Sequence, residues 1–198
     1  MMTQTGTDQV MTLFKECQAL LQGHFKLTSG KHSEWYFEKI RLIERPRVLD
    51  RIVDLLVEKI KTDGLDFDYV ISPAYGAIAI GFLAACKLGK NFAFTQRVED
   101  KMAFRSGWSG IDGSRAIIVE DILTTGGSVQ EVVASLKEKS VSIRGIYVLV
   151  DRTAGSVLIE GKPVGGLLAL KVEAFEPESC PLCHAGVPLV KPGASDKK

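Results

Sequence analysis

The stretch from 115 to 128 constrains the chain most, because an apolar run leads through two acidic residues into a small polar loop. Residues 116–119 are apolar and mostly β-branched, as in a strand buried in a parallel sheet. Glu120 and Asp121 follow directly, and hydroxyl residues and glycines occupy 124–128. A helical pattern begins immediately after this loop. The predicted order is therefore strand, acidic pair, loop and helix.

This order favours a phosphate beside a sugar. The first N–H groups of a helix lack partners inside it and lie at the positive end of its dipole, and glycines let the backbone approach a ligand closely. Two carboxylates would repel a phosphate, so this pair better fits sugar hydroxyls, a metal or a developing positive charge. We therefore predict a phosphoribosyl-binding segment, with an ordinary strand–turn–helix as the alternative. Its residues are Glu120, Asp121, Ile122, Leu123, Thr124, Thr125, Gly126, Gly127 and Ser128.

The size and composition of the chain, with 198 residues, 45% hydrophobic and 25% charged, are those of one globular domain. Its net charge of +1 gives no bulk attraction to nucleic acid or membranes, and we predict neither as a partner. No apolar run reaches the length of a membrane span, and the start of the chain lacks the pattern of a secretion signal. The predicted location is the cytoplasm.

The N-terminal part of the chain predicts a helix, a hairpin and a second helix. After a loose tail at 1–7, apolar residues at helical spacing indicate a helix over 8–21. Two short strands around a Ser-Gly turn indicate a hairpin with an aromatic second arm over 24–38. A longer amphipathic helix is expected over 46–63, after which a glycine ends it.

Strands and helices alternate from 68 to 150, which predicts an α/β fold with a parallel sheet and helices on both faces. Ligands of such sheets gather where the carboxyl ends of strands meet helix N-termini. The loop at 72–77 is a second place of this kind, with a plain strand–helix connection as the alternative. A last strand is expected at 167–172, and residues 191–198 are expected to be disordered.

The segment 96–113 is the least regular part of the chain, and long irregular segments in compact domains are usually functional or disordered. It carries the basic residues Arg97, Lys101 and Arg105. A mobile basic loop can neutralise a pyrophosphate leaving group and exclude water when it closes. The alternative is a solvated charged loop.

Arg152 follows an apolar strand at 143–150 and therefore lies at the carboxyl end of the expected sheet. An arginine beside an anion site is a candidate carboxylate clamp, because its planar guanidinium can bind both oxygens. The alternative is an ion pair with Asp151 or Glu120.

Three motifs of this chain resemble those of orotate phosphoribosyltransferases, a branch of the type I phosphoribosyltransferases. They are Val-Glu-Asp-Ile-Leu-Thr-Thr-Gly-Gly-Ser at 119–128, Val-Asp-Arg at 150–152, and Phe-x-Leu-x-Ser-Gly-x-x-Ser at 25–33. The Cys-Pro-x-Cys tail is similar to that of a divergent bacterial branch of the family. The resemblance covers about residues 12–190.

The resemblance implies the type I phosphoribosyltransferase fold, an α/β architecture with a central parallel sheet flanked by helices and a small N-terminal hood. The whole chain, 1–198, would be one phosphoribosyltransferase domain. Its hood would take in about residues 1–45 and the C-terminal segment, and its core about residues 46–155. In the family the hood closes over the base.

The implied reaction transfers a phosphoribosyl group from phosphoribosyl diphosphate (PRPP) to orotate, a step of pyrimidine biosynthesis, and gives orotidine 5′-monophosphate and pyrophosphate. Mg²⁺ is the implied cofactor, held mainly through PRPP rather than by protein ligands. A homodimer is implied as well, because members of the family often supply the basic loop across the dimer interface.

Individual roles follow from the matched motifs. Asp121 is the implied catalytic carboxylate near the ribose, while Arg97 and Lys101 are implied to neutralise the leaving pyrophosphate. Some relatives carry a lysine after the tyrosine of the pyrophosphate loop, where this chain has Gly76. Further substrate contacts are implied for Ser29 and Gly30 with the pyrimidine, Tyr75 with the pyrophosphate loop, and Arg152 with the orotate carboxylate.

Two other functions stay open on the sequence. One is phosphoribosyl transfer to a different base, against which the arginine at 152 argues, because a purine has no carboxylate. The other is a non-catalytic PRPP-binding regulator, which the near-neutral charge and the lack of a helix-turn-helix region disfavour.

The four cysteines divide into two kinds. Cys17 and Cys86 lie in apolar helical patterns and are predicted to be buried thiols. Cys180, Cys183 and His184 offer three zinc ligands in the tail, one fewer than a closed structural site needs. A structural or incidental cysteine pair is the alternative.

Overall fold

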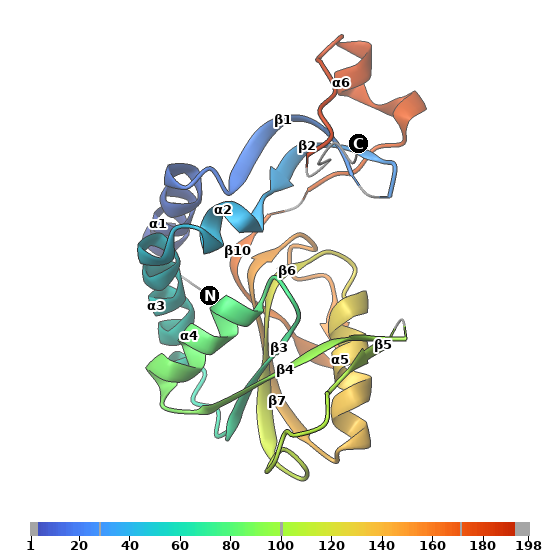
Figure 1. Ribbon diagram of the computed structural model, residues 1–198. Helices are drawn as coiled ribbons and strands as arrows, with labels where there is room; N and C mark the ends of the chain where they lie inside the picture. Colours follow the sequence, from blue (N-terminus) through green and yellow to red (C-terminus); the bar gives the residue numbers. More distant parts are fainter. Residues whose placement is uncertain (1–3, 28, 100, 171, 193–198) are drawn as a thin grey trace.

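The computed structural model describes residues 4–27, 29–99, 101–170 and 172–192, and it is an α/β structure (Figure 1). A six-stranded sheet has the order β10-β7-β6-β3-β4-β5. All neighbouring strands are parallel except the antiparallel pair of β4 and β5. The bounds of these strands are β3 Tyr69–Pro73, β4 Asn91–Val98, β5 Lys101–Ala103, β6 Arg115–Leu123, β7 Ser142–Asp151 and β10 Gly165–Ala169.

Helices cover both faces of this sheet, as predicted. On one face lie α1 (Gln4–Glu16), α3 (Pro46–Thr62) and α4 (Ile78–Leu88), and on the other lies α5 (Gly127–Glu138) (Figure 1). Each face has its own apolar cluster, and successive residues of β6 alternate between them, with Ile117 in the first and Ile118 in the second. This alternation follows from the two-residue period of a strand.

The first helix differs from its prediction at both ends. α1 begins by Gln4, so Asp8 lies inside it, and only 1–3 of the expected tail fall outside the described residues. The helix ends at Glu16, although the apolar spacing continues to residue 21. Residues 20–21 instead pair with 36–37 in a hairpin, because strand pairing there satisfies both backbone and apolar side chains.

The segment predicted to be irregular begins as a hairpin. Arg97 pairs with Met102, and Val98 pairs with Lys101, so β5 folds back on β4. Met102 is buried in the second apolar cluster and anchors this extension to the domain. The prediction of an irregular loop rested on the charged residues of this segment, which give no sign of this buried side chain. Residues 104–114 contain no helix or strand.

The N-terminal hairpin and the C-terminal tail form one end of the molecule (Figure 1). The hairpin consists of β1 (Leu20–Lys26) and β2 (His32–Phe37), followed by the short helix α2 (Lys39–Ile43). The tail carries the 3-10 helix η1 (Pro177–Ser179) and the short helix α6 (Pro181–His184). Two isolated bridges, Phe25 with Val190 and His32 with Phe175, join the tail to the hairpin.

Some smaller predictions need correction. The last strand of the sheet is earlier than the expected 167–172, and two short strands, β8 (Leu158–Ile159) and β9 (Lys162–Pro163), form a hairpin before it. Cys17 is buried as predicted, but Cys86 is exposed, because α4 is apolar nearly all round and its pattern does not mark the outer face. Of the expected disordered end, 193–198 lies outside the described residues.

None of the helices in the described parts of the chain combines the length and the apolar character that a membrane span requires.

Candidate functional site

The acidic pair lies inside the end of strand β6 rather than after it. The strand continues to Leu123, and both carboxylates are buried, with 7% of Glu120 and 2% of Asp121 exposed. Because neighbouring residues of a strand point to opposite faces, the two carboxylates serve different surroundings. Asp121 pairs with Lys39, whereas Glu120 lines a cavity at the start of α5.

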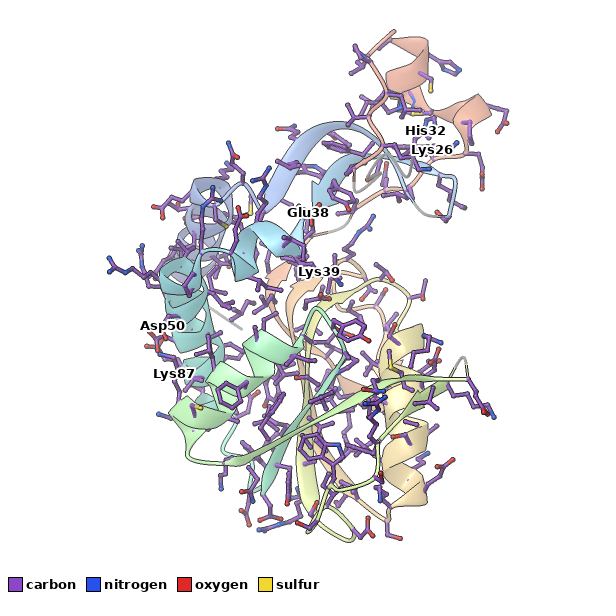
Figure 2. The ribbon with its side chains drawn as sticks, in the orientation of Figure 1. Lys26, His32, Glu38, Lys39, Asp50 and Lys87 are labelled. Carbon is purple, nitrogen blue, oxygen red and sulfur yellow. The ribbon has the colours of Figure 1, made fainter. Side chains whose placement is uncertain are left out.

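Asp121 contacts a lysine that the sequence did not point to. The Nζ of Lys39 lies 2.9 Å from Oδ2 of Asp121, and the lysine side chain is 45% exposed whereas that of Asp121 is 4% exposed. Burial, the largest single influence, would lower the pKa of Lys39, but the charge of Asp121, the hydrogen bond to Asp121 and the charge of Glu120 together raise it. Lys39 extends from α2 into the space between the hairpin and the sheet (Figure 2). Lys39 is the first residue of this short helix, and nothing in the neighbouring sequence marks it as part of a site.

Gly76 is required by this pair. A Cβ at that position would overlap the Asp121 carboxylate and come within 2.6 Å of Nζ of Lys39. The loop at 72–77 therefore passes directly over Asp121, and only a residue without a side chain allows the contact. The ammonium of Lys39 therefore lies beside the backbone of Gly76.

Glu120 lies in the more costly surroundings of the two carboxylates. Burial, and then the neighbouring charge of Asp121, raise its pKa to about 9. Its Oε1 accepts a hydrogen bond of 2.9 Å from the backbone N–H of Asp121. The charged form of this carboxyl is therefore unfavourable in the folded protein.

We expect Glu120→Gln to stabilise the ligand-free protein at high pH. Folded Glu120 keeps its proton up to about pH 9, whereas unfolded Glu120 releases it near 4.5, so the folded state binds more protons between these values and wild-type stability falls as pH rises. Glutamine cannot ionise and preserves the shape. Unfolding by denaturant should show the variant gaining on the order of 4 kcal/mol over wild type between pH 5 and pH 8, because each pH unit in this window contributes about 1.4 kcal/mol.

The matched control is Glu138→Gln, at an exposed glutamate of α5, which should leave the pH dependence unchanged. A Glu120→Gln variant that gains the same stability at both pH values, or none, contradicts the assignment.

The loop after β6 forms the predicted cradle. Gly126, with φ of 86°, caps α5 in a left-handed conformation that favours glycine, and the helix begins at Gly127. A cavity of about 270 Å³ opens here, at the N-terminus of the helix. Its lining consists of Glu120, Ile122, Leu123, Thr124, Thr125, Gly126, Gly127, Ser128, Val129 and Glu131.

A larger cleft of about 700 Å³ lies between the hairpin, the tail and the end of the sheet. Within the described part of the chain, four cationic side chains line it and no carboxylate does. Two of these cations pair with carboxylates outside the lining, and the cleft itself is electropositive. The aromatic rings of Tyr36 and Phe37 supply flat apolar surface. The cationic residues are Lys26, Lys31, Lys39 and Arg152.

Arg152 faces this cleft instead of pairing with its neighbours. The Asp151 carboxylate accepts hydrogen bonds from the N–H of Thr153 at 2.8 Å and the N–H of Gly155 at 2.9 Å, which closes the turn after β7. Among the described residues Arg152 has no ion pair, and the alternative of a salt bridge to Asp151 or Glu120 is not observed. Burial lowers the pKa of Arg152.

The remaining predicted substrate contacts are placed differently. Ser29 lines the larger cleft, and Gly30 forms the turn beside it, with φ of 86° and an N–H that donates to the carbonyl of Leu27 at 2.9 Å. Tyr75 is 82% exposed and lines neither the cradle nor the cleft. Its loop nevertheless reaches the acidic pair through Gly76.

The three basic residues of the 96–113 segment do not converge on the cradle. Arg97 on β4 pairs with Glu131 of α5, which lines the cradle, at 3.1 Å. Lys101 on β5 is exposed and lines none of the cavities described above. Arg105 lines a separate cavity of about 300 Å³ with Trp108. Within one chain, only Arg97 is linked to the cradle.

Comparison with known proteins gives a consistent match. The family of the phosphoribosyl transferase domain matches residues 41–178. The orotate phosphoribosyltransferase of Caldicellulosiruptor bescii is 38% identical over 190 residues, covering 96% of this chain and 98% of that protein. That of Carboxydothermus hydrogenoformans is 40% identical over 182 residues, covering 92% and 95%.

Solved structures give the same answer. The orotate phosphoribosyltransferase from Aeropyrum pernix is 26% identical and superposes with a TM-score of 0.67, covering 82% of this chain and 94% of that one. Together with the acidic pair, the cradle and the cationic cleft at one edge of the sheet, these similarities show that the chain belongs to the orotate phosphoribosyltransferase family of type I phosphoribosyltransferases.

Proposed function

We propose that this chain binds PRPP and orotate in one continuous site and transfers the phosphoribosyl group to a ring nitrogen of orotate. The observation that carries the proposal is that the cradle and the electropositive cleft share part of their lining, which we call the shared wall. Ile122, Thr124 and Thr125 line both the cradle and the electropositive cleft, so a ligand with a phosphate in the first can place its sugar and base toward the second.

The cradle and the acidic pair hold the phosphoribosyl group. Backbone N–H groups at the start of α5, with hydroxyls of 124–128, donate hydrogen bonds to the 5′-phosphate. Glu120 and Asp121 accept hydrogen bonds from the 2′ and 3′ hydroxyls. Breaking the glycosidic C–O bond leaves positive charge on the ribose, and the buried charge of Asp121 stabilises it.

The electropositive cleft holds orotate. The Arg152 guanidinium clamps the orotate carboxylate, and the Ser29–Gly30 turn orients the ring from the hood side. Tyr36 and Phe37 offer surfaces on which a flat pyrimidine stacks. No nucleophile on the protein is needed, because the ring nitrogen attacks the ribose carbon as pyrophosphate leaves.

Pyrophosphate departs past the loop at 72–77, which carries Tyr75. Lys39 faces this loop, and its ammonium, together with Arg97 and Lys101, balances the leaving negative charge. Mg²⁺ would be held mainly through PRPP, and the carboxylate and hydroxyl oxygens that line the cradle are hard donors compatible with it. When bound with PRPP, Mg²⁺ supplies further positive charge to the pyrophosphate.

A homodimer in the cytoplasm is part of the proposal. The exposed position of Lys101 on the β4–β5 extension, outside both cavities, supports a role in the site of a partner subunit. We further propose that the hood, about residues 1–45 with the C-terminal segment, closes over a core of about residues 46–155 within one domain.

Base specificity tests the function directly. With PRPP and Mg²⁺, we expect turnover with orotate and none with adenine, guanine, hypoxanthine or uracil, because only orotate offers a carboxylate to the electropositive cleft. Release of pyrophosphate is the measurement. Turnover with a purine but not orotate would replace the base assignment, and binding of PRPP without any pyrophosphate release would indicate a regulator.

A further inference from the structure

Four metal-binding side chains from opposite ends of the chain meet above the hairpin, away from the substrate site. Their ligand atoms all lie within 4.8 Å of one another. We call this group the His–Cys cluster, and it consists of His24, His32, Cys180 and Cys183. We propose that the His–Cys cluster binds one zinc ion, which fixes the C-terminal tail to the hairpin.

The hairpin supplies both histidines on one face. Lys26 pairs with His32 across the strands, and the strand register shifts between Gln22 and Phe25, the stretch that contains His24. Nε2 of His24 lies 3.0 Å from Nδ1 of His32, so the two rings meet. Their centroids are 4.9 Å apart and their planes differ by 70°. His32 lies at the end of the hairpin beneath α6 (Figure 2). The tail brings both cysteines to this face at the start of α6.

Four of the six distances between the ligand atoms fit a tetrahedral ion, and all six lie within 4.8 Å. With Zn–N near 2.05 Å and Zn–S near 2.3 Å, two nitrogens should lie about 3.3 Å apart, and a nitrogen and a sulfur about 3.6 Å apart. Nε2 of His24 lies 3.0 Å from Nδ1 of His32 and 3.5 Å from Sγ of Cys180. Sγ of Cys183 lies 3.7 Å from the first nitrogen and 3.3 Å from the second.

Hydrogen bonds alone do not account for this convergence. Nδ1 of His24 lies 2.8 Å from the carbonyl of Val187, which can only accept, so this nitrogen carries the proton. In the neutral ring Nε2 then has one lone pair, yet three potential donors face it. A single ion at the centre of the cluster satisfies all four ligand atoms, and the bond to Val187 is the outer contact that orients a zinc-bound histidine.

The surroundings suit a structural rather than a catalytic metal. Three of the four ligands are buried, and four protein ligands leave no open position for water. Two thiolates balance the double charge of zinc. Two nitrogens and two sulfurs in a tetrahedron favour zinc among the common biological metals.

The sequence pointed to a different third ligand. Nε2 of His184 faces the carbonyl of Glu178 at 3.2 Å and takes no part in the cluster. The cluster instead recruits two histidines that are remote in sequence. Backbone bridges already join the tail to the hairpin at Phe175 and Val190. The ion would add side-chain bonds to the same contact and so stabilise it.

One consequence concerns the wall of the electropositive cleft. The same tail contributes Val172, Ala174 and Pro192 to the lining of this cleft. A zinc ion between the two tail segments therefore holds this wall in place. Metal removal should loosen the tail while the six-stranded sheet remains folded, because none of the four ligands belongs to that sheet or lines the cradle.

Metal analysis of the full-length protein, purified under reducing conditions without chelator, tests the proposal. We expect one zinc ion per chain, retained after dialysis, and loss of that zinc in Cys183→Ser. Cys86→Ser, at an exposed cysteine outside the cluster, and His184→Gln, at the neighbouring histidine, should keep it. Cobalt exchanged into the wild type should show thiolate charge-transfer absorption that Cys183→Ser lacks.

Hydrogen exchange on the wild type gives a readout that needs no variant to fold. Stripping the metal should speed exchange in β1, β2 and the tail and leave β6 and β7 unchanged. The proposal fails if the wild type binds no zinc even after incubation with zinc chloride, or if Cys183→Ser holds as much zinc as wild type. A disulfide between the two cysteines in the reduced preparation, detected by mass, would also overturn it.

Discussion

Asp121→Asn should lower kcat by about 10²- to 10³-fold, the scale set by removing one preorganised electrostatic contact from a transition state. The substitution keeps the shape of a side chain that is only 4% exposed and removes its charge beside the ribose. Its ion-pair partner, Lys39, is 45% exposed and can turn toward water. The free energy of unfolding should therefore fall by less than about 3 kcal/mol, the lower figure for breaking a fully buried ion pair.

Steady-state kinetics and denaturant unfolding on the same preparation separate the two effects. Asp112→Asn, at an exposed aspartate with a surface ion pair to Lys139, provides the matched control and should leave kcat unaltered. An unchanged kcat for Asp121→Asn would remove this residue from the mechanism. A fall in kcat accompanied by an equally large loss of stability would make its role structural.

The same variant tests the proposed dimer. If Lys101 acts in a partner's site, a mixture of Asp121→Asn and Lys101→Ala subunits contains hybrids with one intact site. Activity should then rise above that of either variant alone after subunit exchange. No recovery would assign the lysine to its own subunit or to no site at all.

Arg152→Ala should raise the KM for orotate by about 10- to 100-fold, since a hydrogen bond to a charged group contributes about 1.5–3 kcal/mol. The guanidinium is half-buried in the cleft, and the other cations there, which are lysines, cannot reproduce its two-point contact with the orotate carboxylate. The KM for PRPP should change little, because the cradle lies on the far side of the shared wall.

Lys39→Ala is the contrasting variant in that experiment. Its ammonium lies beside Asp121 and the loop at 72–77, so its loss should lower kcat more than it raises the KM for orotate. Initial rates over a grid of both substrate concentrations provide all the constants. Equal effects of Arg152→Ala on both KM values would show that the arginine does not select the base.

The phosphate cradle could be predicted from the sequence because its determinants are local. The apolar run of β6, the glycine that caps α5 and the start of that helix all lie within 115–128. Arg152 was predicted for a similar reason, since the strand before it defines which edge of the sheet it occupies. In both cases the periodicity of the backbone predicts a strand and the point where it ends, and this point decides which side chains lie at the same edge of the sheet.

Contacts between distant segments could not be predicted in this way. The helix over 8–21 was wrong at its end because residues 20–21 pair with a second strand, which helical spacing does not reveal. The hairpin at 97–103 depends on burial of Met102 among side chains of other elements. Such outcomes are set by packing energies that no short window of sequence contains.

The sequence by itself therefore determined the α/β fold, the loop at 124–128 and the position of Arg152, because each follows from local periodicity and capping. Only the tertiary structure decided that Lys39 reaches Asp121 over Gly76 and that two hairpin histidines meet the cysteines of the tail. The physical reason is that such side chains meet only when the hood, the tail and the sheet pack together, and packing depends on the whole chain.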